Sequence, residues 1–205
     1  MIIKTHVSRT PFQENTYILA KNNEVLIIDP GDRMENILPY INPKDKVLAV
    51  LATHGHLDHV SSAKKLCEKF GCPFIINSKD QALLDHLKKS CESYRQEYYG
   101  TPKIDIDIAD KKALSIGPFD IKILHTPGHS QGGVCFLVDG ILFSGDTLFR
   151  RSIGNTTFYG GDLETLLNSI KNELFTLADE TIVYPGHMGT TTIAEEKKYN
   201  PYLNL

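Results

Sequence analysis

The sequence predicts an α/β protein in which two β-sheets pack face to face and helices cover their outer sides. Short runs rich in β-branched residues alternate with longer amphipathic runs along the 205 residues. The strands come in two groups, one in each half of the chain, and helices are interspersed in both groups. Apolar faces in this order bury one another as two stacked sheets with helices outside.

The first half begins with three expected strands, at residues 1–10, 15–20 and 24–31. The runs "NTYILA" and "EVLIIDPG" alternate in the way that strands do on either side of a short turn. The next run, "KVLAVLAT" at 46–53, is almost continuously apolar, so we expect a strand that is buried on both faces.

Two amphipathic runs follow, at residues 60–70 and 78–89, and their apolar residues have helical spacing. A short strand is expected between them, at 73–77. Ser78 is the expected N-cap of the second helix. The polar and aromatic stretch that continues to residue 111 has weak periodicity and predicts only a partly helical excursion.

The second half predicts four more strands and one strongly amphipathic helix that is capped by Asp162. The strands are expected at residues 119–126, 132–140, 141–146 and 181–187, and the helix at 162–177.

Composition favours one globular domain over residues 1–205, because 41% of the residues are hydrophobic. The formal net charge of −3 gives no broad electrostatic reason to bind nucleic acid or an anionic membrane. The N-terminus lacks the basic and apolar regions of a signal peptide, and no apolar run approaches the ~20 residues of a membrane span.

The four cysteines form no CxxC pair and do not resemble a disulfide framework. Cys67 and Cys135 lie in apolar runs, so we expect both to be small core residues. Cysteine usage is therefore typical of a protein of the reducing cytoplasm.

Four turns in the sequence share one design, in which an apolar strand ends in small residues that carry a histidine or an aspartate. They are "LATHGHLDH", "ILHTPGHS", "ILFSGDTLF" and "IVYPGHMG". Functional groups tend to collect on loops at one end of a rigid sheet. If the four strand ends share an edge, seven imidazole and carboxylate groups converge: His54, His56, Asp58, His59, His129, Asp146 and His187.

The spacing within "HGHLDH" allows one short loop to serve two metal ions. His54 and His56 are two residues apart and face the same way in an extended segment, whereas Asp58 and His59 are adjacent near a helix start. Imidazole and carboxylate ligands suit zinc, iron or manganese, and the lack of a cysteine ligand argues against a closed structural zinc site. His6, His86 and His125 are expected to be ordinary structural residues.

The ordered motifs "THGHLDH", "TPGHS", "SGDTLF" and "PGH" resemble those of the metallo-β-lactamase superfamily of hydrolases. The resemblance extends to the flanking strands and is strongest to the glyoxalase II-like branch, the hydroxyacylglutathione hydrolases. It implies an αββα sandwich of two mixed sheets flanked by helices, with a dinuclear metal site between the sheet edges. It also implies a supporting position near the site for Asp29.

The resemblance divides the seven residues between two divalent ions, with zinc as the first expectation and iron or manganese as alternatives. The first ion would be held by His54, His56 and His129, and the second by Asp58, His59 and His187. Asp146 would bridge them. We expect catalytic roles for Asp58, which would orient the attacking water, and for Asp146.

Two features set this sequence apart from full-length glyoxalase II enzymes. Those enzymes carry a C-terminal helical domain with basic glutathione contacts, whereas this sequence ends 18 residues after His187 and resembles the shorter, single-domain members. The loop that often reads Gly-Arg-Ser-Asp in that branch is Gly-Asn-Thr-Thr here, at 154–157. Arg150 and Arg151 could supply the missing positive charge to a substrate, or could be exposed loop residues.

The predicted reaction is hydrolysis of a small thioester, with S-2-hydroxyacylglutathione as the first candidate. Two metal ions would make hydroxide available near neutral pH, and a thiolate leaves without a general acid. One alternative is a persulfide dioxygenase with a single iron. The motifs also fit a lactonase or phosphodiesterase of the same superfamily, or a metal-binding protein without catalysis. No membrane or nucleic-acid partner is expected, and the sequence does not determine the oligomeric state.

Overall fold

A computed structural model describes residues 1–203 and contains two six-stranded sheets that pack face to face. The strands of the first sheet lie in sequence order: β1 (Ile2–Val7), β2 (Asn15–Lys21), β3 (Glu24–Ile28), β4 (Lys46–Leu51), β5 (Phe74–Ile76) and β6 (Ile106–Asp107). The pairs from β1 to β3 are antiparallel and those from β3 to β6 are parallel, so the sheet is mixed.

The second sheet is also mixed, because β10 and β13 are parallel and its other neighbours are antiparallel. Its order is β14 (Thr191–Thr192), β13 (Ile182–Pro185), β10 (Ile141–Gly145), β9 (Val134–Val138), β8 (Phe119–His125) and β7 (Ala113–Ile116). A separate two-stranded ribbon joins β11 (Leu148–Phe149) to β12 (Ser152–Ile153).

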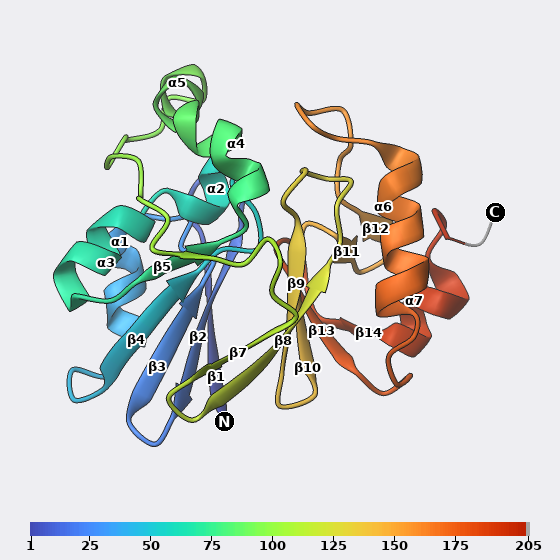
Figure 1. The fold of residues 1–205 in the computed structure, drawn as a ribbon, viewed down its shortest axis with the longest axis horizontal. Coiled ribbons are helices and arrows are strands. Elements are labelled where there is room, and N and C mark those ends of the chain that lie inside the picture. Colours follow the sequence, from blue (N-terminus) through green and yellow to red (C-terminus); the bar gives the residue numbers. More distant parts are fainter. Residues whose placement is uncertain (204–205) are drawn as a thin grey trace.

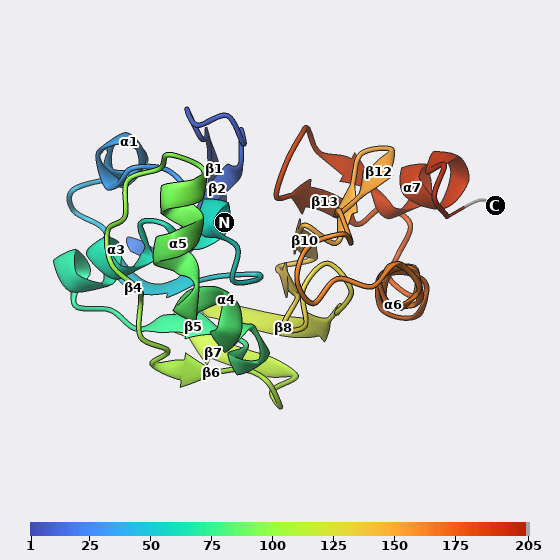
Figure 2. The same cartoon turned by 90° about the horizontal axis from the view of Figure 1, so that it is seen from above.

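Helices form the two outer layers, as Figures 1 and 2 show. The first sheet is covered by α1 (Met34–Ile37), α2 (Leu57–Val60), α3 (Ala63–Phe70), α4 (Gln81–Asp85) and α5 (Leu87–Ser93). The second sheet is covered by α6 (Leu163–Ser169) and α7 (Ile193–Tyr199). The predicted αββα sandwich is confirmed.

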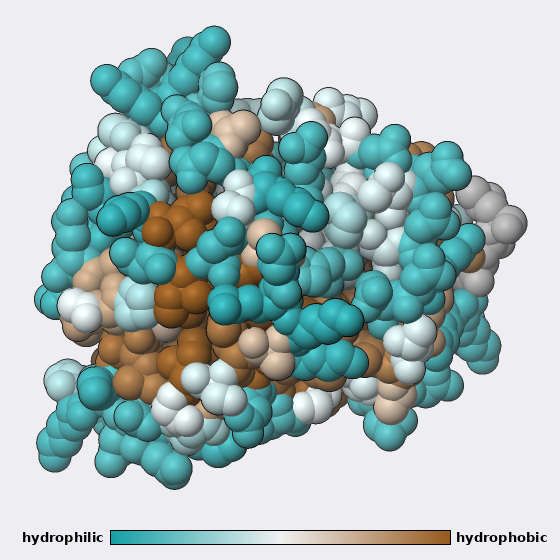
Figure 3. Space-filling view, in the orientation of Figure 1, coloured by the Kyte–Doolittle hydropathy of each residue, from teal (hydrophilic) through white to brown (hydrophobic). Residues whose placement is uncertain are grey.

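Three apolar clusters correspond to the three contacts between these four layers. One joins the first sheet to its helices and includes Ile27 and Leu66, and one lies between the sheets and includes Leu26 and Phe136. The third joins the second sheet to α6 and α7 and includes Leu142. On the face in Figure 3, hydrophilic side chains cover most of the surface, and apolar ones gather in the region of β5 and β7.

The predicted helix at 60–70 corresponds to α3 at Ala63–Phe70, and its expected first residue, Val60, instead ends the preceding turn α2. The hydroxyl of Ser61 donates to the carbonyl of Leu57, and the hydroxyl of Ser62 donates to the carbonyl of Asp32. Serine hydroxyls compete with the backbone for such acceptors and so interrupt helices. The break keeps α2 as a separate turn, and this turn carries two of the predicted metal ligands.

Other elements differ in detail from the prediction. The N-cap of the 3₁₀ turn at Ser78–Asp80 is Asn77, whose side chain accepts from the backbone N–H of Lys79, so the prediction of Ser78 was wrong. Asp162 caps α6 as predicted, and a π turn at Ile170–Leu174 extends it. The strand at 182–185 is not the last element, because β14 and α7 follow.

Cys135 is buried as predicted, but Cys67 is only half-buried, on α3, because its side of the helix faces the rim of the core. None of the helices within residues 1–203 is long and apolar enough to cross a membrane.

Candidate functional site

The seven residues expected from the four turns come together in the structure. His54 and His56 follow β4, and Asp58 and His59 lie on α2. The other three follow the carboxyl ends of β8, β10 and β13, where His129, Asp146 and His187 stand. Three sets of side chains each have ligand atoms within 4.8 Å of one another: His54, His56 and His129; His54, His59 and Asp146; Asp58, His59 and His187.

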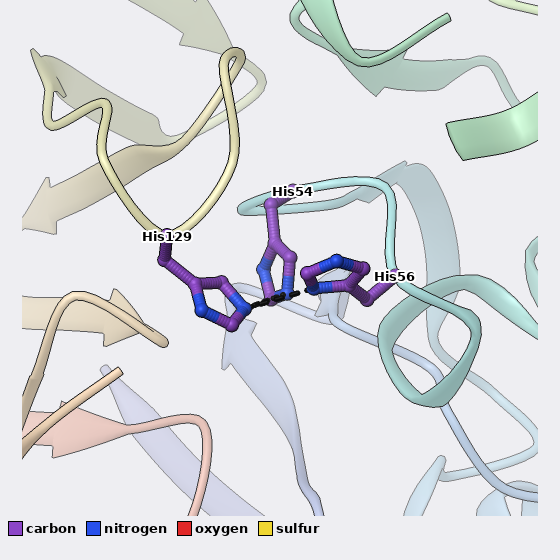
Figure 4. Close-up of side chains that lie close together, drawn as sticks. All are labelled: His54, His56 and His129. Atoms are coloured by element: carbon purple, nitrogen blue, oxygen red, sulfur yellow. Dashed lines mark hydrogen bonds between the residues drawn. The ribbon is translucent and has the colours of Figure 1, made fainter. Parts of the chain in front are cut away.

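The first triad consists of His54, His56 and His129, whose ring nitrogens point toward one another in Figure 4. His129 Nε2 lies 2.8 Å from His56 Nδ1 and 3.2 Å from His54 Nε2. The two loops that supply these rings are far apart in sequence, so the packing of the two sheets brings them together.

The second triad consists of Asp58, His59 and His187. His187 Nε2 lies 3.4 Å from Asp58 Oδ2, and His59 Nε2 lies 3.9 Å from the same oxygen. Asp146 stands between the triads, because its carboxylate is 3.2 Å from His59, 3.4 Å from His187 and 3.5 Å from His129. Asp146 therefore lies where one carboxylate could serve both triads.

Hydrogen bonds outside the triads orient the histidine rings. His129 Nδ1 donates to the carbonyl of Asn155 over 2.7 Å, and His187 Nδ1 donates to the carbonyl of Phe12 over 2.9 Å. A carbonyl can only accept, so each ring carries a proton on Nδ1 and turns its Nε2, the atom that would bind a metal ion, into the site. Outer partners of this kind are typical of metal-binding histidines.

Asp29 supports the other two buried rings. Its carboxylate accepts from His59 Nδ1 at 3.0 Å and from the Thr53 backbone and hydroxyl at 2.7 Å each. Because the Thr53 hydroxyl donates to Asp29, it can accept from His54 Nδ1 at 3.1 Å. Asp29 thereby fixes the orientation of one histidine from each triad, in the supporting position that the resemblance implied.

One direct observation indicates that the arrangement suits metal ions. Within residues 1–203, the buried side-chain atoms without a hydrogen-bond partner are His59 Nε2 and Asp146 Oδ1, which face each other. Buried polar atoms normally have partners, so such a pair needs an explanation. A cation between the nitrogen and the oxygen would satisfy both. The spacing of the first triad is also close to the roughly 3.3 Å between nitrogens bound tetrahedrally at about 2.0 Å.

Protonation differs between the triads in the metal-free protein. Burial lowers the pKa of His56 to about 4, and burial also holds the pKa of His54 well below its usual value. Burial opposes protonation of His187 too, but the carboxylates of Asp146 and Asp58 outweigh it and raise its pKa to about 9. His54 and His56 therefore offer neutral rings at pH 7, whereas His187 is protonated and positively charged.

Asp80 is a site residue that the sequence did not reveal. Its buried carboxylate accepts from the backbone N–H of Gly55 at 2.9 Å, from the hydroxyl of Ser130 at 2.8 Å and from the backbone N–H of Gly132 at 2.6 Å. Gly55 separates the first two histidines of the motif, and Ser130 follows His129. One carboxylate thus joins the two loops that carry the whole first triad.

A second unpredicted feature is a clamp on the turn that carries His187. The Asn15 amide donates to the carbonyls of Pro185 and Met188, at 2.9 Å each, and the Tyr17 hydroxyl also donates to Pro185. Met188 has a left-handed φ of 69°, which costs energy for a residue with a side chain. The bonds from β2 hold this turn and its histidine in place.

Gly186 is required beside His187 because no side chain fits there. A Cβ at this position would lie 2.2 Å from Asp146 Oδ1 and 2.7 Å from His59 Cε1. Two groups of the site therefore occupy the space of the missing side chain, which explains the glycine of "PGH".

The expectation that Arg150 or Arg151 contacts substrate is not supported. Arg151 pairs with Glu195 of α7 at 2.7 Å and stacks on the Tyr199 ring, whose centroid is 4.3 Å away. Neither arginine is among the described residues that line the cavity at the site. Arg151 does not line the cavity because its guanidinium pairs with the carboxylate of Glu195. This residue lies on α7, a helix that follows the last predicted strand.

The remaining histidines are structural, as predicted. His6 pairs with buried Asp32 at 2.8 Å. His86 Nδ1 donates to the carbonyl of Ala82, and His125 Nε2 donates to that of Lys111.

A cavity of about 460 Å³ opens beside both triads. His56, Asp58, His129, Asp146 and His187 line its inner end. The candidate ligands can therefore be reached by a small molecule.

Comparison with known proteins identifies the chain's relatives. Residues 9–187 match the model of the "Metallo-beta-lactamase superfamily". A curated protein of Haemophilus influenzae named "Hydroxyacylglutathione hydrolase GloC" is 38% identical over 206 residues, which cover 95% of each chain.

Two solved structures are similar over nearly the whole chain. The structure of the BLEG-1 B3 metallo-β-lactamase has a TM-score of 0.92 at 34% identity and covers 100% of both chains. The structure of TTHA1623 in a di-iron-bound form has a TM-score of 0.87 at 32% identity and covers 99% of this chain and 100% of the other.

Proposed function

Because the chain belongs to the metallo-β-lactamase superfamily, it is a metal-dependent hydrolase, and we propose that it hydrolyses small thioesters. The observation that carries the proposal is the convergence of both triads on Asp146 beside an open cavity. The thioester follows from the relative of Haemophilus influenzae, whose name is that of a hydroxyacylglutathione hydrolase. S-2-hydroxyacylglutathione is the first substrate to test.

Two divalent ions would be held by the residues already described, one by each triad, with Asp146 shared. When bound, such ions lower the pKa of a water molecule and polarise the carbonyl under attack. Zinc is the first expectation from imidazole and carboxylate ligands, and the di-iron form of TTHA1623 makes iron the second.

The chain's own residues have distinct tasks in this reaction. Burial opposes ionisation of Asp58, but the charge of His59 outweighs it and keeps the pKa of Asp58 below its usual range. Asp58 is therefore a carboxylate at neutral pH, lines the cavity and can orient a water molecule toward the substrate. Asp29 and the carbonyls of Phe12 and Asn155 hold the histidine rings in the required tautomer.

Direct attack by water fits the cavity wall. Ser90 and Ser152 line it, but among residues 1–203 neither hydrogen-bonds to a histidine that could activate it as a nucleophile. The oxygen of water forms a bond to the carbonyl carbon and its protons pass to solvent, while the carbon–sulfur bond breaks and its electron pair leaves with sulfur. A thiol has a pKa of about 8.5, so the thiolate can depart without a protein acid and then takes up a proton from solvent.

Two complete triads favour hydrolysis over the alternative of a persulfide dioxygenase with a single iron. A single metal at the first triad would give no role to Asp58 and His187, which line the same cavity. Oxygen consumption with glutathione persulfide would reveal that alternative.

The test is hydrolysis of S-D-lactoylglutathione by protein that is stripped of metal and reloaded with zinc, iron(II) or manganese. We expect activity that depends on metal and falls more than about a hundredfold in His54→Ala and in His59→Ala, since even outer-shell changes cost 10–100-fold. His125→Ala is the matched control, because this histidine lies outside the site. Hydrolysis that survives both substitutions and a chelator would contradict the proposal.

A further inference from the structure

Aromatic and apolar side chains form the outer wall of the cavity beside the triads. They are Phe12, Tyr94, Phe149, Phe158, Tyr159 and Met188. These residues come from separate parts of the chain: the segment before β2, the end of α5, strand β11, the loop after β12, and the turn after β13. A volume of about 460 Å³ with such a lining is typical of a small-molecule site.

The wall begins at the candidate ligands themselves. The Phe158 ring lies edge to face with His56 at 5.5 Å and with His129 at 6.2 Å between centroids. Phe149 contacts His187 in the same way at 5.7 Å. A carbonyl placed at the triads therefore has phenyl rings beside it on both sides, and any group attached to that carbonyl must lie along them.

Several of these side chains are open to solvent. Phe158 is 45% exposed, Tyr94 51%, Met188 59% and Tyr159 69%. Burial of exposed apolar area is favourable, and aromatic rings contribute large areas. A ligand with an apolar group would cover this surface and gain binding free energy from it.

The wall offers no positive charge. Among the described residues that line the cavity there is neither lysine nor arginine, and Asp58 and Asp146 are carboxylates. Arg151, the cation expected here, is held by Glu195. Glutathione carries carboxylates at both ends of its tripeptide, and these would find no lysine or arginine among the described residues of the cavity lining.

We propose that the cavity selects thioesters with an uncharged, apolar arm, which lies against Phe158 and Tyr159 while the carbonyl lies at the triads. The proposal rests on the proposed hydrolysis of thioesters and specifies their class. The loop at 154–161 is its structural basis: Asn155 and Thr157 are uncharged, and two large aromatic residues, Phe158 and Tyr159, follow them.

The test is a homologous series of acyl thioesters of N-acetylcysteamine, an uncharged thiol, from acetyl to hexanoyl, with S-D-lactoylglutathione for comparison. Release of thiol is followed with a chromogenic disulfide reagent on the metal-loaded protein. Burial of a methylene is worth ~0.8 kcal/mol, so kcat/KM should rise about fourfold for each added methylene until the wall is covered. The longer members should exceed lactoylglutathione.

Variants connect the series to the wall. Phe158→Ala should flatten the rise with chain length, and Phe158→Leu should restore most of it. Phe158→Arg should lower kcat/KM for hexanoyl thioester and raise it for lactoylglutathione. Tyr202→Ala is the control, because this tyrosine is also about half exposed but does not line the cavity. Since Phe158 is 45% exposed, these variants are expected to fold.

The outcomes separate this proposal from the previous one. A flat series with lactoylglutathione as the best substrate would overturn the apolar wall while leaving thioester hydrolysis intact. Equal slopes in Phe158→Ala and the parent would also overturn it. Absence of hydrolysis for every thioester, with metal bound, would instead contradict the proposed function.

Discussion

Removal of the Asp80 carboxylate should lower the stability of the protein and the metal affinity of the first triad, although all three histidines of the triad remain. Asp80→Ala removes the common acceptor of two backbone N–H groups and one hydroxyl, all buried. A hydrogen bond to a charged group is worth about 1.5–3 kcal/mol, and the losses are not fully additive. We expect the free energy of unfolding to fall by ~3–5 kcal/mol, and by about 2 kcal/mol in Asp80→Asn, which keeps one acceptor oxygen.

Metal affinity should change at one triad only. Loss of an outer partner typically costs 10–100-fold in affinity, so the ion held by His54, His56 and His129 should be weakened by about that factor. The second triad has no contact with Asp80 and should change little. Competition with a chromophoric chelator measures both affinities, and urea unfolding measures the stability.

Asp85→Ala is the control for this experiment, because Asp85 lies on α4 close to Asp80 but is exposed, and its carboxylate accepts from the side chain of Gln81. An equal loss of affinity for both metal ions would exclude a specific role of Asp80 at the first triad, since it would indicate general unfolding. Unchanged affinity in a destabilised variant would show that the loops hold their histidines without the carboxylate.

Three further results are expected. Asp146→Asn should weaken both ions together, because the amide removes the charge that the two triads share; elemental analysis that finds two ions bound at the parent affinity would exclude the shared role. Arg151→Ala should leave the KM for lactoylglutathione unchanged, as its guanidinium pairs with Glu195, and a several-fold rise would restore the expectation of a substrate contact. The second ion should displace protons at pH 7 from both of its histidines, because His187 has a pKa of about 9 in the metal-free protein and, although burial opposes it, nearby carboxylates hold the pKa of His59 well above its usual value; the affinity for this ion should therefore increase with pH above 7. Burial keeps His56 neutral down to about pH 4, and that ring should release none; calorimetry in buffers of different ionisation enthalpy counts the protons.

The candidate ligands could be predicted because each lies where an apolar strand meets a turn. The order of strands and turns was therefore enough to expect them at one edge. His129 also lies in a turn after an apolar strand, although its contact with His54 depends on the packing of the two sheets. The fold followed from the same alternation of apolar runs.

Asp80 could not be predicted, because its role depends on residues 50 and 52 positions away. In the sequence it is an ordinary acidic residue in the first turn of a helix. The clamp by Asn15 spans 170 positions and was hidden for the same reason. Local pattern identifies the groups that face the site, whereas the groups that hold them are determined by tertiary contacts.

The direction of Arg151 was likewise beyond the sequence. Its left-handed backbone, with φ at 61°, and the carboxylate of Glu195 on α7 decide where the side chain points. The helix that supplies this carboxylate follows what the pattern of strands indicated as the last element. A positive charge near a motif is therefore weak support for a substrate contact.

Seven side chains of one chain would hold two ions for the hydrolysis of a thioester. The most direct measurement is a stepwise titration of the metal-free protein with zinc, in which bound metal and thioester hydrolysis are followed on the same sample. We expect binding that saturates at two ions per chain and activity that reaches its maximum with the second. Saturation at one ion per chain with full activity, under zinc, iron(II) and manganese alike, would exclude a site of two ions.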